Sequence, residues 1–215
     1  MMRTKTGFLL AGLLACAAAA AMPADAPADA RAERLADALV KMLPMGKIFA
    51  DAAAANPKWP LQEKPEAVSA EQLACVRGEL SVDGYRRARL EEARQYAAAN
   101  PSRMDQDLAL LDGGAARLFG TMVQAGADEA STGKKAVPEE ILASATSEEV
   151  LSFVTFISDP AYAGLRKLSG YGDAFDVTRS AHENEKAGEQ LGASLAVQLM
   201  IKAMGTCKVP PSAYM

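Results

Sequence analysis

The sequence predicts an all-α protein, a compact multi-helix bundle, and three observations support that prediction. Half of the 215 residues are hydrophobic but only 6% are aromatic, whereas strands draw on aromatic and β-branched residues. Much of the apolar share is alanine, and Ala, Leu, Glu, Arg and Lys all favour helices. The apolar residues also recur at helical spacing along most of the chain. The length fits a single domain.

The first 21 residues have the parts of a secretory signal. Arg3 and Lys5 precede an apolar run that is too short to span a bilayer, and no later stretch is long and apolar enough to do so. In one interpretation a signal peptidase removes residues 1–21. In the other, Leu13-Leu14-Ala15-Cys16 is a lipobox, so that Cys16 carries a lipid. We expect a bacterial periplasmic protein, either soluble or tethered to the outer membrane through that lipid alone.

Loss of the signal makes the remaining chain more acidic. Removal of Arg3 and Lys5, with no acid among residues 1–21, changes the formal net charge from −4 to −6. Contacts to nucleic-acid phosphates need clustered Lys and Arg. We therefore expect no nucleic-acid partner and no attraction to anionic lipid surfaces.

The counts of histidine and cysteine limit the chemistry. One histidine and three cysteines exclude a His₃ or Cys₄ metal cage, and we expect no metal and no cofactor. His182, Glu185 and Glu189 would share one face of a helix. No second motif completes a ligand set, so a solvated helix face is the preferred interpretation.

Two cysteines, Cys75 and Cys207, remain once Cys16 is set aside. In an oxidising compartment such a pair favours a disulfide, which would tie an early helix to the C-terminal tail. Closure of so large a ring is worth at most ~5 kcal/mol.

The predicted helical domain covers residues 31–215 and follows a flexible tether at 22–30. Its first helix begins near Ala30 and ends at Pro44, and a short second helix follows around 48–53. The proline-rich segment 56–68 is an irregular loop that carries Trp59. We expect the next helices to begin at a capping box, Ser69 with Gln72, to restart at Ser81 and to stop at Asn100-Pro101.

The second half of the domain follows the same rules. Ser102 and Asp105 predict a helix start, and Gly113-Gly114 predicts a kink or a close helix approach. Residues 126–136 lack apolar periodicity and predict a linker. A short helix from Pro138, a capping box at Thr146 and Glu149, a break at Asp159-Pro160 and a turn at 169–172 follow. The last helix, from about Ala174 to Met204, is apolar on most sides after Leu191, so we expect it at the centre of the bundle, with Gly205 as its cap.

Residues 146–168 carry a helix–proline–helix unit with Phe153 and Phe156 before Ser158-Asp159-Pro160. This unit resembles a family of small helical, secreted bacterial proteins of unknown function. The resemblance implies an all-α envelope protein and supplies no catalytic residues.

The function we expect is protein binding without catalysis. There is no Gly-x-Ser-x-Gly and no complete dinucleotide loop, so no catalytic residue is assigned. The arginines 86, 87, 89 and 94 alternate with acids, which favours a solvated face over an anion site. The candidate partner-binding residues are Trp59, Tyr171 and Tyr214, although Trp59 is more easily explained as a plug against the core.

The concrete hypothesis is an inhibitor or immunity protein that neutralises a toxin acting in the bacterial envelope. One alternative is a carrier or sensor that holds an apolar ligand between helices, in a cavity lined by Met104, Leu118, Met122 and Met200. Another alternative is a hydrolase that uses two converging carboxylates.

Overall fold

The all-α prediction is confirmed by a computed structural model of the chain. The structure describes residues 28–61, 65–133, 135, 137–172, 174 and 178–213, and these contain helices and connecting turns but no strand. The signal segment with Cys16, most of the tether and Tyr214 lie outside the described residues. The last three residues of the predicted tether are helical, because α1 (Ala28–Met42) begins at Ala28.

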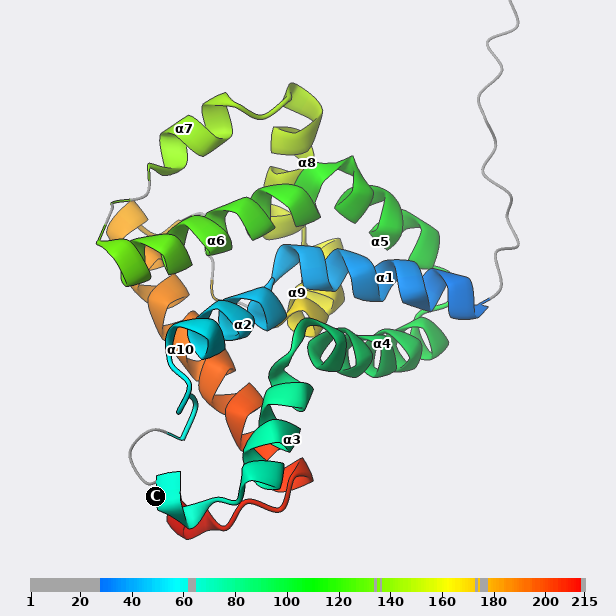
Figure 1. Cartoon of the computed structure of the whole chain (residues 1–215). Helices are drawn as coiled ribbons and strands as arrows, with labels where there is room; N and C mark the ends of the chain where they lie inside the picture. The colour runs from blue at the N-terminus through cyan, green and yellow to red at the C-terminus, as the bar shows by residue number, and fades with distance from the viewer. Residues whose placement is uncertain are drawn as a thin grey trace, which may run out of the picture.

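Helix α1 lies at the centre of the bundle. It packs between α4 (Val82–Ala99) and α6 (Ala116–Thr132), and its buried stripe includes Leu35, Leu39 and Met42 (Figure 1). The crossing with α6 is close: a Cβ at Gly120 would run into the Lys41 carbonyl oxygen. Glycine is therefore required at this crossing for steric reasons.

The helix breaks and helix caps predicted in the first half of the domain are confirmed. Pro44 separates α1 from α2 (Met45–Ala55). After the short 3₁₀ turn η1 (Pro65–Ala67), the capping box of Ser69 and Gln72 opens α3 (Ala70–Leu80). Ser81 then accepts a hydrogen bond from the Gly84 amide and starts α4, as expected.

The predicted kink at Gly113-Gly114 is also confirmed. Helix α5 (Met104–Leu110) continues through a π-helical turn, η2 (Leu111–Ala115), into α6, and Gly114 has φ of 126°. The expected cap at Ser102 is wrong, because α5 begins at Met104 after Arg103, which makes no side-chain cap.

The linker expected at 126–136 is largely wrong. Helix α6 continues to Thr132 and ends at the left-handed Gly133. Bonds one turn apart support this exposed extension: Gln124 donates to Asp128 at 2.8 Å, and the Thr132 hydroxyl donates to the Asp128 carbonyl oxygen at 2.6 Å. Apolar periodicity arises where one face of a helix is buried. A fully solvated helical turn lacks it, so its absence from these residues does not predict a linker.

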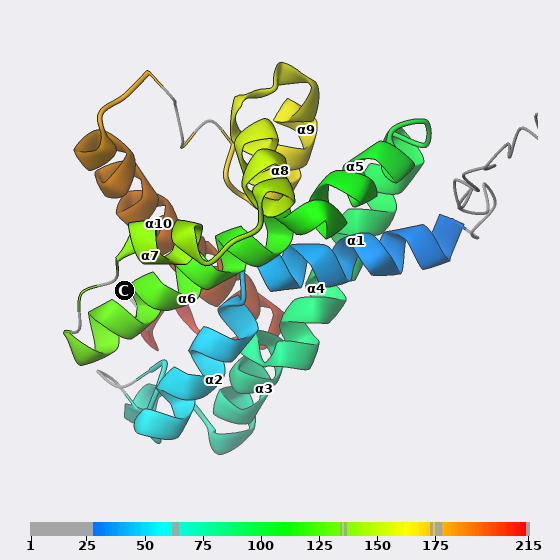
Figure 2. The same ribbon diagram turned by 90° about the horizontal axis from the view of Figure 1, so that it is seen from above.

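The helix–proline–helix unit forms as predicted. Helix α7 (Pro138–Ala143) precedes α8 (Ser147–Ser158), and the 3₁₀ turn η3 (Pro160–Tyr162) leads into α9 (Ala163–Ser169). Figure 2 shows α8 on one side of α6 and both α2 and α3 on the other.

The central position expected for the last helix is wrong. Helix α10 (Ala181–Thr206) begins at a capping box formed by Ser180 and Glu183, contains Gly205, and ends at Cys207. Its outward side chains Val197 and Ile201 are 50% and 52% exposed. Hydrophobicity all round the helix predicted burial, but only the inward side chains, such as those of Ala203 and Met204, are covered. The chain then closes with the short 3₁₀ turn η4 (Pro211–Ala213).

Candidate functional site

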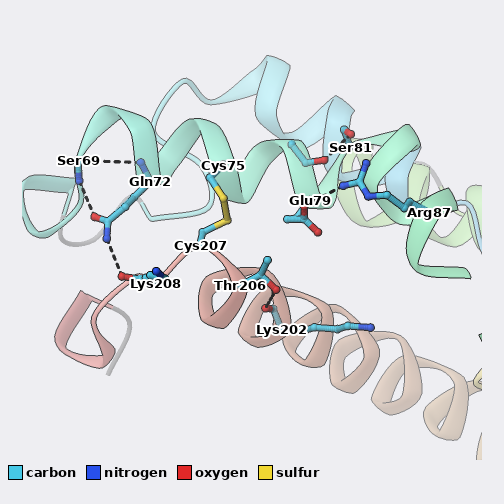
Figure 3. Close-up of a disulfide and its surroundings, with 11 residues drawn as sticks. Ser69, Gln72, Cys75, Glu79, Ser81, Arg87, Lys202, Thr206, Cys207 and Lys208 are labelled. Atoms are coloured by element: carbon cyan, nitrogen blue, oxygen red, sulfur yellow. Dashed lines mark hydrogen bonds and ion pairs between the residues drawn. A yellow bond between two sulfur atoms is a disulfide. The ribbon is translucent and has the colours of Figure 1, made fainter. Parts of the chain in front are cut away.

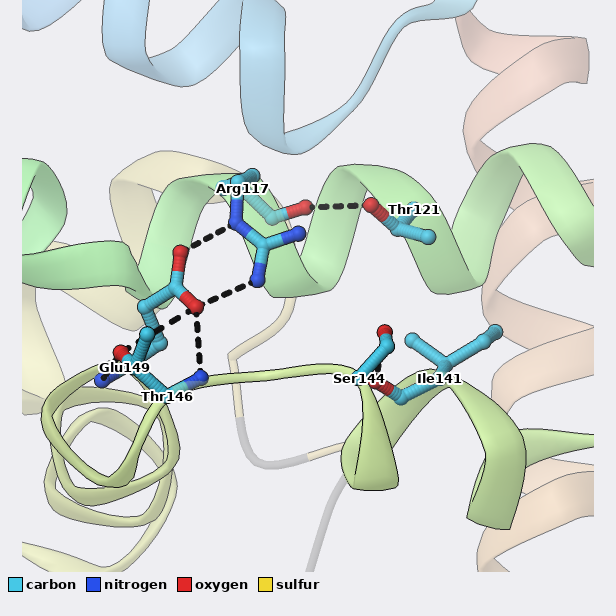
Figure 4. Close-up of polar contacts among 6 residues, drawn as sticks. All are labelled: Arg117, Thr121, Ile141, Ser144, Thr146 and Glu149. Atoms are coloured by element: carbon cyan, nitrogen blue, oxygen red, sulfur yellow. Dashed lines mark hydrogen bonds and ion pairs between the residues drawn. The ribbon is translucent and has the colours of Figure 1, made fainter.

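The first turn of α8 is fixed by a bidentate ion pair. Arg117 of α6 donates from Nη2 to Glu149 Oε2 at 2.6 Å and from Nε to Oε1 (Figure 4). The same carboxylate accepts from the Thr146 amide at 2.9 Å, and the Thr146 hydroxyl accepts from the Glu149 amide at 3.2 Å. The Arg117 hydrogen bond, followed by the Thr146 amide, lowers the pKa of Glu149 to about 2. The sequence predicted the capping box but not its arginine partner.

The backbone of α8 lies against the π turn η2, at the kink between α5 and α6. A Cβ at Gly113 would lie 2.6 Å from Ser152 Oγ, and one at Gly114 would lie 2.7 Å from the Glu149 Cα. Position 114 therefore needs glycine, both for this close approach to the Glu149 backbone and for its positive φ, whereas the Ser152 hydroxyl could rotate away from a Cβ at Gly113. Gly114 explains how α8 can pack directly onto the turn.

The inward face of α8 ends in an aromatic cluster. Phe119 of α6 has ring centroids 4.6 Å from Phe153, 5.1 Å from Phe156 and 4.5 Å from Tyr171. Tyr171 is only 4% exposed, and its hydroxyl donates to the Met42 carbonyl oxygen at 3.4 Å. The prediction of Tyr171 as a partner-binding residue is therefore wrong, since its ring completes the core beneath α8.

The outward face of α8 is apolar and exposed. Leu151 is 66% exposed and Val154 is 45% exposed, although both belong to a helix with a fixed inward face. Together with Ala145, Ser147 and Val150 they line an open hollow of about 380 Å³. We call this set of five residues the α8 surface.

The stretch of chain that carries the α8 surface is acidic. Residues 137–158 include four glutamates and neither lysine nor arginine. Glu149 is occupied by Arg117, whereas Glu139, Glu140 and Glu148 are exposed. The sequence did carry a signal for this site: apolar residues at 150, 151, 153, 154 and 157 are too many for one buried face of a twelve-residue helix.

The predicted solvated arginine face is confirmed for three of its four members. Arg86, Arg87 and Arg94 are ion-paired to the acids Asp37, Glu79 and Asp29, at 2.7, 2.9 and 3.2 Å respectively.

Arg89 differs, because it is buried. It donates to Glu92 at 2.7 Å and to the Leu168 carbonyl oxygen at 3.4 Å, and its guanidinium lies over the Tyr85 ring. Arg89 therefore joins α4 to the end of α9, whereas the other three link α4 to α1 or α3 at the surface.

Asp107 of α5 is a buried carboxylate that the sequence pattern does not reveal. Asp107 accepts hydrogen bonds from the Tyr96 hydroxyl at 2.8 Å and from Arg103 at 3.1 Å. Burial, followed by the hydrogen bond to Asp107, raises the pKa of Tyr96. In the sequence Asp107 resembles any acid in a first helical turn. Its fully satisfied bonds give it a structural role that joins α4 to α5.

The disulfide prediction is confirmed. Cys75 of α3 and Cys207 are bonded, with their Cα atoms 5.8 Å apart (Figure 3). Beside the bond, the Gln72 side-chain amide donates to the Lys208 carbonyl oxygen at 2.8 Å. These contacts attach the C-terminal end of α10 to α3.

The remaining candidate residues are Trp59, His182 and the four residues predicted to line a ligand cavity. Trp59 is partly buried, with its ring centroid 5.5 Å from that of Phe49, in agreement with its interpretation as a plug. His182 is exposed, and the described residues hold no group of three His, Cys, Asp or Glu side chains suited to a metal ion.

Of the four residues predicted to line a ligand cavity, Met104 and Leu118 are buried in the core and Met122 and Met200 are partly buried. None of them lines the α8 hollow. Among the described helices, none has the length and hydrophobicity needed to cross a membrane.

Comparisons with protein-family models, with curated proteins and with solved structures find no match to this chain.

Proposed function

We propose that this chain is a non-catalytic protein-binding protein that docks its partner on the α8 surface. The observation that carries the proposal is Leu151, which is 66% exposed on a helix whose opposite face is fixed by Arg117, the π turn and the aromatic cluster. Large apolar side chains that stay exposed on a rigid element are typical of interaction surfaces. A rigid element also loses little conformational entropy on binding.

In its concrete form, the proposal is an inhibitor or immunity protein that neutralises a toxin in the bacterial envelope. The signal-like residues 1–21, the acidic charge and the Cys75–Cys207 bond support an exported protein. The resemblance of residues 146–168 to secreted helical proteins supports the same location, and those residues include four of the five residues of the α8 surface.

A matched pair of variants tests the binding function. Leu151→Asp alters the α8 surface, and Val197→Asp places the same charge on a comparably exposed apolar position of α10. The mature chain and both variants are immobilised and exposed to envelope extract, and cells that express each form are challenged with envelope-acting toxins. The proposal expects a partner captured by the mature chain and by Val197→Asp but lost by Leu151→Asp, with protection lost in parallel.

Two outcomes contradict the proposal. Capture that is equal for all three proteins places binding elsewhere than α8. No stoichiometric partner and no protection in any form would remove the protein-binding function itself.

A further inference from the structure

The C-terminal end of the chain is crosslinked at a point that solvent can reach. Cys75 on α3 is exposed, whereas its partner Cys207, at the cap of α10, is 8% exposed (Figure 3). Thiol–disulfide exchange needs a thiolate to approach one of the two sulfur atoms, so access decides which disulfides react. The exposed side at Cys75 therefore gives a thiol a route to this bond.

The residue that follows the crosslink has an unfavourable backbone conformation. Lys208 has φ of 54°, in the left-handed region that glycine favours. Its amide donates to the Gly205 carbonyl oxygen at 3.2 Å, and the Val209 amide donates to the Met204 carbonyl oxygen at 3.0 Å. This pair of bonds ends a helix at a residue that is usually glycine. The path of the chain at Lys208 therefore costs free energy that other contacts must offset.

The residues after α10 close over a part of the chain that is far away in sequence. The turn η4 packs against η1, and Val209 and Ala213 are only 5% and 4% exposed. The Lys208 carbonyl oxygen also accepts the hydrogen bond from Gln72 of α3. We call residues 207–213 the C-terminal tail. Its release would uncover the two buried side chains and the surface beneath them.

The other helices are packed by contacts outside the tail. Helix α10 places three leucines against the core, and its Ala203 and Met204 are buried; the leucines are Leu191, Leu195 and Leu199. Helix α8 is held by α6 and by the π turn η2. Opening of the crosslink can therefore free the tail without dismantling the bundle.

We propose that the Cys75–Cys207 disulfide is a redox-sensitive clasp on the C-terminal tail. The thiolate of a dithiol reductant attacks the Cys75 sulfur and forms a mixed disulfide, and Cys207 leaves as a thiolate that takes up a proton. The second thiol of the reductant then displaces Cys75, so the protein gains two thiols and the reductant becomes a disulfide. Once the crosslink is gone, relief of the conformation at Lys208 favours release of the tail. The clasp thereby couples exposure of the tail to the thiol–disulfide state of the surroundings.

The experiment follows amide hydrogen exchange of the full mature chain, without denaturant, before and after treatment with dithiothreitol. Alkylation and mass spectrometry count the free thiols in each sample. We expect two thiols after treatment, and exchange about tenfold or more faster at the Val209 and Ala213 amides, which are hydrogen-bonded in the closed tail. Helices α1 and α8 should exchange as slowly as before, and reoxidation should restore the closed tail.

Variants at position 208 test the contribution of the backbone. Lys208→Gly removes the cost of the left-handed φ, so the closed fraction of the reduced tail should rise about fivefold relative to the open fraction. Lys208→Gln is the matched control, because it removes the charge but keeps a side chain, and it should leave this ratio unchanged. The variant C75S/C207S, which has no crosslink, should show the open tail with or without dithiothreitol.

Three results would overturn the clasp. A disulfide that dithiothreitol reduces only after denaturant is added would show that Cys75 is not open to attack. Full reduction with Val209 and Ala213 still protected would show that the other contacts hold the tail. Loss of protection throughout the bundle would show that the bond braces the whole fold.

Discussion

Helices α8 and α10 expose similar apolar side chains but are attached to the bundle in different ways. Helix α8 is fixed along its inward face by Glu149–Arg117, by the close approach of Gly114 in the π turn and by the phenylalanine cluster. Helix α10 packs partly buried side chains such as Leu191, Leu195 and Leu199 against the core, and its C-terminal end is crosslinked through Cys207.

This difference teaches that exposed hydrophobicity alone does not select a functional surface. The α8 surface adds an open hollow to its exposed side chains, and it lies on a helix whose inward face is fixed by an ion pair, so a partner can bind it without ordering the helix first.

The largest effect on the free energy of unfolding is expected when the disulfide is removed. Cys75→Ser with Cys207→Ser should cost about 2–5 kcal/mol in the free energy of unfolding, because the bond closes a very long loop. Urea unfolding measures the total, and amide hydrogen exchange locates it. Exchange should accelerate in α10 and the C-terminal tail while α8 stays protected. Equal loss of protection in α8 would contradict the independent attachment of the two helices.

The next largest effect on the free energy of unfolding is expected at Gly114 in the π turn. Gly114→Ala adds a Cβ that overlaps Glu149 and forces alanine into a positive φ, so we expect a cost of ~1–3 kcal/mol and loosening of α8. Gly126→Ala is the matched control, since a Cβ there meets no neighbour and alanine should stabilise α6 by ~0.5–1 kcal/mol. A neutral Gly114→Ala would show that α8 does not depend on this close approach.

The extent to which sequence predicted this structure depends on the range of each interaction. Signals that act within a few residues were sufficient to predict where helices begin and end. They are Pro44, the capping boxes at Ser69 and Thr146, and the break at Asp159. The disulfide was predicted from the expected oxidising compartment and from the two cysteines that remain once Cys16 is set aside. The burial of Arg89 and Tyr171 and the exposure of Leu151 depend on which helices pass beside them, which spacing along one helix does not reveal.

Acid should weaken the attachment of α8 through protonation of Glu149. The folded pKa of Glu149 is about 2, below its usual 4.5, so its contribution is fully present above pH 4.5 and is lost as the pH falls towards 2. The urea midpoint, followed across this window, should therefore fall with pH, and less steeply in Glu149→Gln. Arg117→Met should remove the same part of the pH dependence. An unchanged slope in both variants would contradict the role of this ion pair.

The smallest effect on stability is expected at the exposed apolar residues. Leu151→Asp and Val197→Asp should each change the free energy of unfolding by no more than ~0.5 kcal/mol, because both side chains are at least half exposed. Chemical denaturation measures both. A large loss in Leu151→Asp would mean that its effect on binding reflects unfolding.

Amide hydrogen exchange of the mature chain, with and without its captured partner, shows which helix docks the partner. New protection is expected over residues 145–158, around the α8 surface, with residues 190–201 of α10 unchanged. New protection confined to α10, or absent from α8, would contradict docking on α8.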